Sequence, residues 1–275
     1  MNRFKTGEHA GVTWVQGLAG WSNFSIKVFL YLVDEVLIDT GPARLSDTLL
    51  PYLDQQKIAA ILLTHYHEDH SGNAPYLASR GIPAYINAIS LKRCHQKTRL
   101  PLYRKMFWGN REAFFPYPLN GDFKFGDLTW VPVFTPGHVF DHQAFYLPER
   151  GFMFTGDLFV TPRPRMILNT ENTPHMIEDL KTVLRYDFTT VFCSHAGIVA
   201  RGKEMLQKKL EYLQEIQEAV LHLHHQGWSV SEITRKIFPG TVLLEYLSGR
   251  EWSAKHMIKS VITGKATAEI PKLQT

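Results

Sequence analysis

The sequence predicts a layered α/β domain followed by a smaller region that is helical throughout. Up to about residue 197, short apolar runs alternate with turns and a few helical stretches, and no repeat is evident. After about residue 200, apolar residues recur only every three or four positions, which is the period of an amphipathic helix. We therefore expect one domain over residues 1–200 and a second region over residues 201–275.

The composition is typical of a globular protein with a substantial core. The chain has 275 residues, 44% of them hydrophobic and 20% charged. Its formal charge of +4 is too small for this length to imply nucleic acid on its own. Cys94 and Cys193 are the only cysteines, which excludes a disulfide framework. The start MNRFKTGEHA lacks the apolar core of a signal peptide, and no window approaches the roughly 18 apolar residues of a membrane span, so we expect a cytoplasmic protein without a membrane partner.

The first region contains several strands that end in turns. Residues 26–33 and 36–38, separated by Asp34 and Glu35, predict a β-hairpin, and residues 45–53 predict a helix that leads to an apolar strand over 58–63. A helix through 74–79 is expected to end at Gly81, and one over 174–184 to start from Thr173 as its N-cap. The remaining strands are predicted at 83–86, 128–134, 144–147, 152–155 and 190–194.

Three helices are expected after residue 200. One long amphipathic helix is marked by apolar residues between Leu206 and Leu223 and stops at Gly227. Two capping boxes follow, Ser229 with Glu232 and Ser248 with Glu251, and each is expected to open a further helix.

The stretch THYHEDH, residues 64–70, places three histidines, a glutamate and an aspartate directly after the apolar strand at 58–63. His65 and His67 can point the same way from an extended segment, and Asp69 and His70 come at the expected start of the next helix. Imidazole and carboxylate groups are ligands that zinc prefers. A lone His-x-His is more often a surface or packing feature, so this stretch alone leaves both interpretations open.

Three later strand ends carry similar residues. TPGH places His138 in a turn after one strand, TGD places Asp157 after another, and SHAG places His195 after a third. Each lies near a glycine or proline that lets the backbone approach a compact site. Because α/β folds commonly place their sites at strand ends, these positions favour a metal site over a solvated turn.

Residues 12–197 resemble the metallo-β-lactamase superfamily of hydrolases. The resemblance rests on five motifs in this order: LIDTG at 37–41, THYHEDH at 64–70, TPGH at 135–138, TGD at 155–157 and SHAG at 194–197. It implies an αββα sandwich as the catalytic domain, with a dinuclear site at one edge. It further implies that the first metal is bound by His65, His67 and His138. The second would be bound by Asp69, His70 and His195, and Asp157 would bridge the two. Asp39 would orient a ligand or its loop.

The resemblance also implies the chemistry. Two cations about 3.5 to 4 Å apart lower the pKa of a shared water toward ~7, so that a bridging hydroxide forms at neutral pH. Asp69 is the expected catalytic residue, which holds and reorients the proton of this nucleophile. Two zinc ions are the first expectation, and iron or manganese also suit a mixed nitrogen and oxygen site.

Other polar residues have weaker interpretations. His142 either lines the substrate cleft or supports the site from behind. Tyr66 and Glu68 are expected to face outward, unless Tyr66 reaches the substrate, and Cys193 is expected to be a buried packing thiol. His222, His224 and His225 suit the end of the long helix, where positive charge is favourable, better than a second metal site.

The segment from 80 to 111 is basic and has no acidic residue. It carries eight Lys or Arg residues together with Tyr103, Phe107 and Trp108. Such a run is either a solvated face or, as the family resemblance implies, a wall over the metals that holds a small anionic or nucleotide-like substrate.

The C-terminal segment 256–270 looks like the last helix and first wing of a winged-helix module. It is similar to the appendage of the β-lactamase-like protein 2 group, which includes a single-strand endoribonuclease. Three functions are therefore considered. The first is a dinuclear metal hydrolase of an ester, thioester or lactone. The second uses the same site to cut a phosphodiester in RNA or a nucleotide. The third is an oxygen-using iron enzyme or an inert scaffold that binds nucleic acid.

Overall fold

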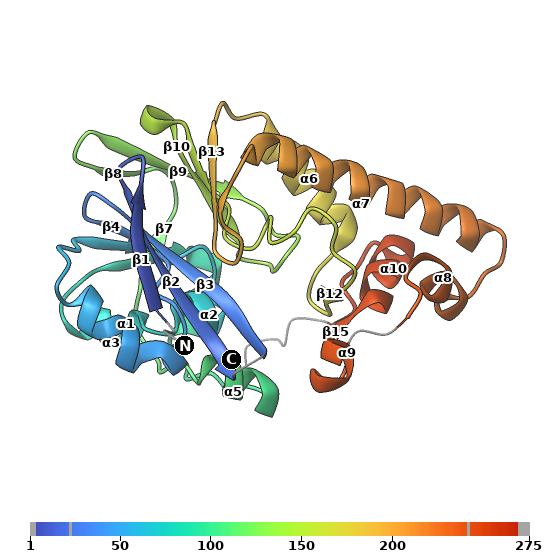
Figure 1. Cartoon of the computed structure of the whole chain (residues 1–275), viewed down its shortest axis with the longest axis horizontal. Helices are drawn as coiled ribbons and strands as arrows, with labels where there is room; N and C mark the ends of the chain where they lie inside the picture. Colours follow the sequence, from blue (N-terminus) through green and yellow to red (C-terminus); the bar gives the residue numbers. More distant parts are fainter. Residues whose placement is uncertain (1–3, 22–23, 241–242, 269–275) are drawn as a thin grey trace.

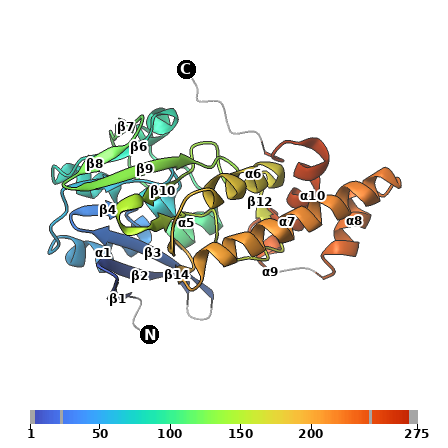
Figure 2. The same cartoon turned by 90° about the horizontal axis from the view of Figure 1, so that it is seen from above.

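The computed structural model describes residues 4–21, 24–240 and 243–268, and its architecture confirms the predicted α/β sandwich (Figure 1). Two sheets pack face to face, and helices cover the outer face of each, which gives the layer order αββα. The long helix α7 (Gly202–His225) lies beside α6 (Thr173–Leu184) and runs beyond the sheets to a group of short helices (Figures 1 and 2).

The first sheet has seven strands in the order of the sequence. Its first half is antiparallel, and the pairing becomes parallel from β4 onward. The predicted hairpin is confirmed, because Val33 pairs with Val36 across the two-residue turn. The strands are β1 (Phe4–His9), β2 (Val12–Trp21), β3 (Phe24–Val33), β4 (Val36–Ile38), β5 (Ala60–Leu62), β6 (Ala84–Asn87) and β7 (Tyr117–Leu119).

The second sheet has six strands in the order β14-β13-β11-β10-β9-β8. Only β11 and β13 pair in parallel, which brings the ends of these two strands to the same edge. The strands are β8 (Phe123–Phe125), β9 (Leu128–Phe134), β10 (Gln143–Leu147), β11 (Phe152–Phe154), β13 (Thr190–Cys193) and β14 (Gly197–Val199). The strands predicted in this region are thus confirmed to within a residue at either end.

Aromatic side chains fill the space between the sheets. Tyr31, Trp130, Phe154 and Phe192 are each at most 1% exposed, and the rings of Phe154 and Phe192 stack with centroids 4.8 Å apart. Rings in such contact add about 0.5–1.5 kcal/mol to the stabilisation from their buried area. This rigid layer supports the strand ends from which the site residues project.

Short helices cover the first sheet. They are α1 (Ser46–Leu53), α2 (Glu68–Ser71), α3 (Ala74–Ser79), α4 (Leu91–Cys94) and α5 (Leu102–Trp108). The helix expected to run from Asp69 through 74–79 is two helices, because the chain turns at Gly72. A Cβ at Gly72 would lie 2.4 Å from the backbone nitrogen of Ala43, so the close approach of this turn to the 40–43 loop requires glycine.

The second sheet is covered by α6 and α7, which share one apolar cluster with α8 (Val230–Ile237) and α10 (Ala254–Thr263). The capping box of Ser229 and Glu232 at the start of α8 is confirmed. Two other caps were wrongly predicted. Asn172, not Thr173, caps α6 by accepting a hydrogen bond from the backbone N–H of His175.

The second capping box is the other error. Ser248 lies after α9 (Leu243–Leu247), and its hydroxyl accepts from the backbone N–H of Trp252 rather than opening a helix. Helix α10 starts later, with Ser253 as its cap. Ser253 and Trp252 form the short strand β15 (Trp252–Ser253), which pairs with β12 (Ile167–Leu168) and ties the C-terminal helices to the 160s loop.

The winged-helix prediction falls partly on residues 269–270, which lie outside the described residues. Of residues 256–268, the structure places 256–263 in α10, and no strand follows up to residue 268. A domain boundary near residue 200 stays a prediction. Within the described ranges, no helix is both long and apolar enough to cross a membrane.

Candidate metal centre

The seven predicted ligand residues lie together, at the ends of strands from both sheets. His65, His67, Asp69 and His70 follow β5, and the other three follow β9, β11 and β13. They form two groups, His65, His67 and His138 in one and Asp69, His70, Asp157 and His195 in the other, and within each group the candidate ligand atoms all lie within 4.8 Å of one another. The expectation that separate strand ends meet at one site is therefore met by the fold.

Three imidazole nitrogens face one another in the first group. His67 Nδ1 lies 2.9 Å from His65 Nε2 and 3.2 Å from His138 Nε2. All three side chains are buried, with at most 4% of each residue exposed. Three inward-facing ring nitrogens at this spacing are a donor set that suits zinc.

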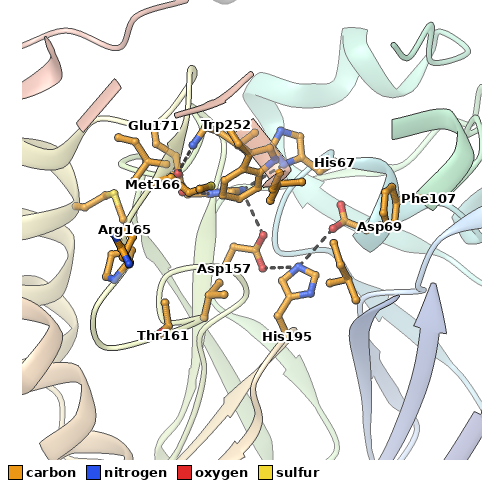
Figure 3. Close-up of a pocket in the computed structure, with 18 of the residues that line it drawn as sticks. His67, Asp69, Phe107, Asp157, Thr161, Arg165, Met166, Glu171, His195 and Trp252 are labelled. Carbon is orange, nitrogen blue, oxygen red and sulfur yellow. Dashed lines mark hydrogen bonds and ion pairs between the residues drawn. The ribbon is translucent and has the colours of Figure 1, made fainter. Parts of the chain in front are cut away.

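Asp157 lies between the two groups. Its Oδ2 is 3.4 Å from His138 Nε2 of the first group, whereas its Oδ1 is 3.4 Å from His70 Nε2 and 3.2 Å from His195 Nε2. The second group is completed by Asp69, whose Oδ2 is 3.4 Å from His195 Nε2. The Asp157 carboxylate thus presents one oxygen to each group. Figure 3 shows its contact with His195 and the contact of His195 with Asp69.

The chemistry of these groups fits metal ions. His70 Nε2 and Asp157 Oδ1 are buried and have no hydrogen-bond partner among the described residues. An unpaired buried polar atom is costly unless a ligand satisfies it. Five imidazoles and two carboxylates supply nitrogen and oxygen donors, and a cation in each group would satisfy the atoms that face inward.

The second ring nitrogen of several of these histidines is held from behind. His70 Nδ1 lies 2.7 Å from Asp39 Oδ2, and His195 Nδ1 donates to the carbonyl of Lys27 over 2.7 Å. Asp39 also accepts hydrogen bonds from the backbone and hydroxyl of Thr64, which fits the orienting role expected for it. Such contacts fix the orientation and tautomer of a ligand histidine.

Glu171 makes a contact of the same kind that the sequence analysis missed. Its Oε1 lies 2.7 Å from His138 Nδ1, and its Oε2 accepts from the backbone N–H of Leu168. Glu171 precedes α6 and is 33 residues from His138, so no local spacing links the two. The only signal in the sequence is an acidic residue next to a helix start.

The pKa values at the site reflect burial and close charges. Burial, and then the neighbouring His70, hold the pKa of His65 well below its usual value. Burial alone would raise the pKa of Asp69 and of Asp157. The positive charges of His70 and His195 outweigh it and keep both carboxyl pKa values below their usual range. Both aspartates are therefore anionic at neutral pH, which is the form that binds metal.

His142 supports the site and does not line the cleft. It is fully buried, its Nε2 accepts a hydrogen bond from the backbone N–H of Asp157 at 3.0 Å, and its Nδ1 lies 2.8 Å from the hydroxyl of Thr135. Gly156, with φ of +49°, allows this turn, because a Cβ there would lie 2.6 Å from His142 Nε2. Burial lowers the pKa of His142 to about 3, so the ring stays neutral and can accept.

Glu68 does not face outward, which corrects the sequence analysis. It is 2% exposed and accepts two hydrogen bonds from Arg104 of α5, at 2.5 and 3.0 Å. Arg104 also donates to Glu251 at 2.8 Å, and Glu251 accepts from the hydroxyl of Tyr103. Tyr66 is half-buried against Phe140. The ion pairs join the ligand loop, the basic segment and the C-terminal region.

The site opens into a pocket of about 340 Å³ (Figure 3). Its lining is largely apolar, with five ligand candidates on one side. The apolar surface comes from side chains that include Phe107, Trp108, Met166, Ile167, Leu168, Met176 and Trp252. Lys209 of α7 also reaches this pocket, where it is 2% exposed and donates to the carbonyls of Leu158 and Phe159 at 2.7 and 2.8 Å. Burial lowers the pKa of Lys209 to about 8.

The basic segment forms part of the wall, although most of its basic side chains are exposed, and a role in holding a substrate stays a prediction. Phe107 and Trp108 of α5 line the apolar pocket, and Arg104 lies where that pocket meets a second groove of about 1130 Å³. Arg111 is fully buried and donates to the carbonyls of Arg93 and Cys94, so its role is structural. Cys193 is buried in β13, as expected for a packing thiol.

Comparisons with known proteins agree with this geometry. A hydroxyacylglutathione hydrolase from Idiomarina loihiensis is 30% identical over 76% of this chain and 73% of its own length. An atrochrysone carboxyl ACP thioesterase from Aspergillus fumigatus is 26% identical over 68% of this chain, which spans 55% of the length of that relative. The chain spans 34% of a lactamase-like protein, adaB, from Aspergillus niger.

Solved structures show the same fold. A metallo-beta-lactamase family protein from Thermus thermophilus superposes with a TM-score of 0.67 over 92% of each chain, at 19% identity. The family model described as the metallo-beta-lactamase superfamily matches residues 28–195, the stretch that carries all seven ligand candidates. The chain therefore belongs to the metallo-β-lactamase superfamily.

Proposed function

We propose that this protein is a two-metal hydrolase that cleaves an acyl bond, an ester, thioester or lactone. The observation that carries the proposal is the position of Asp157, which presents one carboxylate oxygen to each of two ligand groups at one side of an apolar pocket. An acyl substrate suits this site because most of the surface of the pocket is apolar.

The residues divide by the metal they would hold. His65, His67 and His138 would bind one ion, and Asp69, His70 and His195 the other, with Asp157 shared. Bound zinc ions would supply a water of lowered pKa and polarise the carbonyl oxygen. Iron or manganese is compatible with the same donors.

The chain's own groups account for the proton. As a ligand of the second ion, Asp69 would be anionic, because a carboxylate binds metal in its deprotonated form. Its Oδ2 lies 3.4 Å from His195 Nε2 and lines the pocket, so it can accept the proton of the attacking water. The water oxygen bonds to the acyl carbon, the bond to the leaving group breaks, and the proton passes from Asp69 to the leaving oxygen or sulfur.

The relatives support an acyl substrate. One is named a thioesterase and another a hydroxyacylglutathione hydrolase. A thioester is therefore the first substrate class to test.

Metal content and activity test the proposal together. We expect about two equivalents of metal per chain by mass spectrometry in protein purified without chelator. Asp157→Ala should lose metal and reduce thioester hydrolysis at least a hundredfold. The control Asp127→Ala removes an exposed carboxylate in the turn between β8 and β9 and should change neither the metal content nor the activity. Less than one equivalent of metal, or unchanged hydrolysis in Asp157→Ala, would refute the proposal.

Phosphodiester cleavage in RNA is the second candidate, and the basic groove beside the site is the observation that favours it. Cleavage of single-stranded RNA, abolished in Asp157→Ala, together with salt-dependent binding, would support it. Oxygen uptake by iron-loaded protein would instead support an oxygenase.

A further inference from the structure

We propose that the groove beside the metal centre binds the phosphate groups of a thiol leaving group, so that the substrate is an acyl thioester of a phosphorylated carrier thiol such as coenzyme A. This inference rests on the proposed acyl hydrolase function. It adds to that function the place and chemistry of the leaving half of the substrate, which the ligand residues do not define.

The two cavities differ in character. The smaller pocket has a mostly apolar surface, from side chains such as Phe107, Met166 and Ile167, and Thr161, Arg163 and Arg165 also line it. The larger groove is lined by polar and basic side chains of residues 93–111, by Asn169 and Thr170, and by Glu68 and Glu251. An amphiphilic substrate with an apolar acyl chain and an anionic tail matches this pair of cavities.

The groove carries an unbalanced positive charge. Its two acidic residues, Glu68 and Glu251, both pair with Arg104, and five further Lys or Arg residues line the groove. Lys97 pairs with Glu112. Arg99 and Lys105 are exposed in the groove, and neither side chain forms an ion pair with a described residue. Two free cations in a concave surface attract phosphate groups more strongly than the same charges on a convex surface.

The cavities meet beside the metal site. His67 and Arg104 line both, and His67 is one of the candidate ligands. A substrate that occupied both cavities would therefore place its central bond at the ligands. In an acyl thioester of a phosphorylated thiol, this central bond is the one that hydrolysis cleaves.

RNA matches the groove but not the pocket. A polynucleotide could run along Arg99 and Lys105, but the mostly apolar surface of the pocket matches an acyl chain better than a further charged nucleotide. An acyl thioester of a phosphorylated thiol matches both cavities, with the acyl chain in the pocket and the phosphate groups in the groove.

Direct binding of coenzyme A tests the groove without turnover. The variant is Arg99→Glu/Lys105→Glu, and the control is Arg80→Glu/Lys124→Glu, which reverses two exposed charges outside both cavities. By titration calorimetry we expect the groove variant to raise the Kd of coenzyme A at least tenfold. Its Kd for pantetheine, which has the same thiol without phosphates, should stay within twofold, and the control should leave both unchanged.

Hydrolysis gives a second readout. For decanoyl-coenzyme A the groove variant should raise KM at least tenfold with kcat within threefold, and for decanoyl-N-acetylcysteamine both constants should stay unchanged. Equal losses on both substrates, or no change on either, would overturn the assignment. So would tight binding of a single-stranded oligoribonucleotide that coenzyme A does not displace. Wild-type protein that binds coenzyme A through these residues but cleaves no thioester, ester or lactone would support the groove and refute the acyl hydrolase.

Discussion

Replacement of Arg104 by methionine tests the buried ion pairs that join the ligand loop to the C-terminal region. Methionine retains most of the apolar stem and removes the guanidinium group. Two carboxylates then lose their partner, Glu68, which is 2% exposed, and Glu251, whose side chain is 17% exposed. Because Glu68 is adjacent to Asp69, we expect the change to loosen the second ligand group as well as the fold.

The magnitude follows from the burial of the two acids. Removal of one partner from a buried ion pair costs about 3–5 kcal/mol, because the remaining charge is uncompensated. Burial already raises the pKa of Glu68, so it can take up a proton in the variant, which limits the cost. We therefore expect a loss of about 3 kcal/mol in the free energy of unfolding, a decrease of about 1 M in the urea midpoint if the denaturant slope is about 3 kcal/mol per M.

Urea unfolding followed by tryptophan fluorescence measures this loss. The double variant Arg104→Met/Glu68→Gln removes the stranded charge and should recover at least about 1 kcal/mol of it. Arg150→Met is a matched control, because its partner Asp34 lies on the surface and such pairs contribute about 0–1 kcal/mol. A loss below about 1 kcal/mol in Arg104→Met, or a double variant no more stable than the single one, would refute the reasoning.

Three further predictions concern other parts of the molecule. The folded-state pKa of Lys209 is lowered to about 8, below its value in the unfolded chain, so the unfolded state binds more protons between about pH 8 and 10.5. The stability of the wild type should therefore rise across this window by up to about 3 kcal/mol relative to Lys209→Met, and parallel pH profiles in urea unfolding would contradict this. Ser229→Ala removes the cap of α8 and should lower the local stability of that helix by about 1 kcal/mol, measured by amide hydrogen exchange; unchanged protection would show that the cap is dispensable. Trp108→Ala removes a large part of the apolar wall and should raise KM for a decanoyl thioester about tenfold. The KM for the acetyl thioester should change little, and equal changes in the two KM values would place the acyl chain elsewhere.

The sequence predicts the parts of the site that follow a strand. His65, His138, Asp157 and His195 each come directly after an apolar run, and strand ends meet at one edge of a layered fold, so local pattern and layer architecture are sufficient to bring them together. The hairpin of β3 and β4 is predictable for a similar reason, because its turn is only two residues long.

The parts that could not be predicted depend on partners far along the chain. Glu68 resembles a loop residue until Arg104, 36 positions later, and Glu251 are brought beside it. The errors at helix starts are of another kind. Asn172 and Thr173 both have side chains that can cap a helix, and the structure uses Asn172. Ser248 fits a capping box, but its hydroxyl accepts a hydrogen bond from the backbone N–H of Trp252, the first residue of β15. Pattern alone cannot decide between equivalent local hydrogen bonds.

The positions of Trp252 in the pocket and of Glu251 in the groove have a consequence for synthesis on the ribosome. Residues 28–195 contain every candidate ligand, so metal-binding side chains emerge while the rest of the chain is still being made. Trp252 of the pocket wall is translated only after α7 and α8. The same holds for Glu251, whose carboxylate accepts hydrogen bonds from Tyr103 and Arg104. A nascent chain thus contains every candidate ligand before it contains the residues that complete the wall of the pocket and the ion pairs of Arg104.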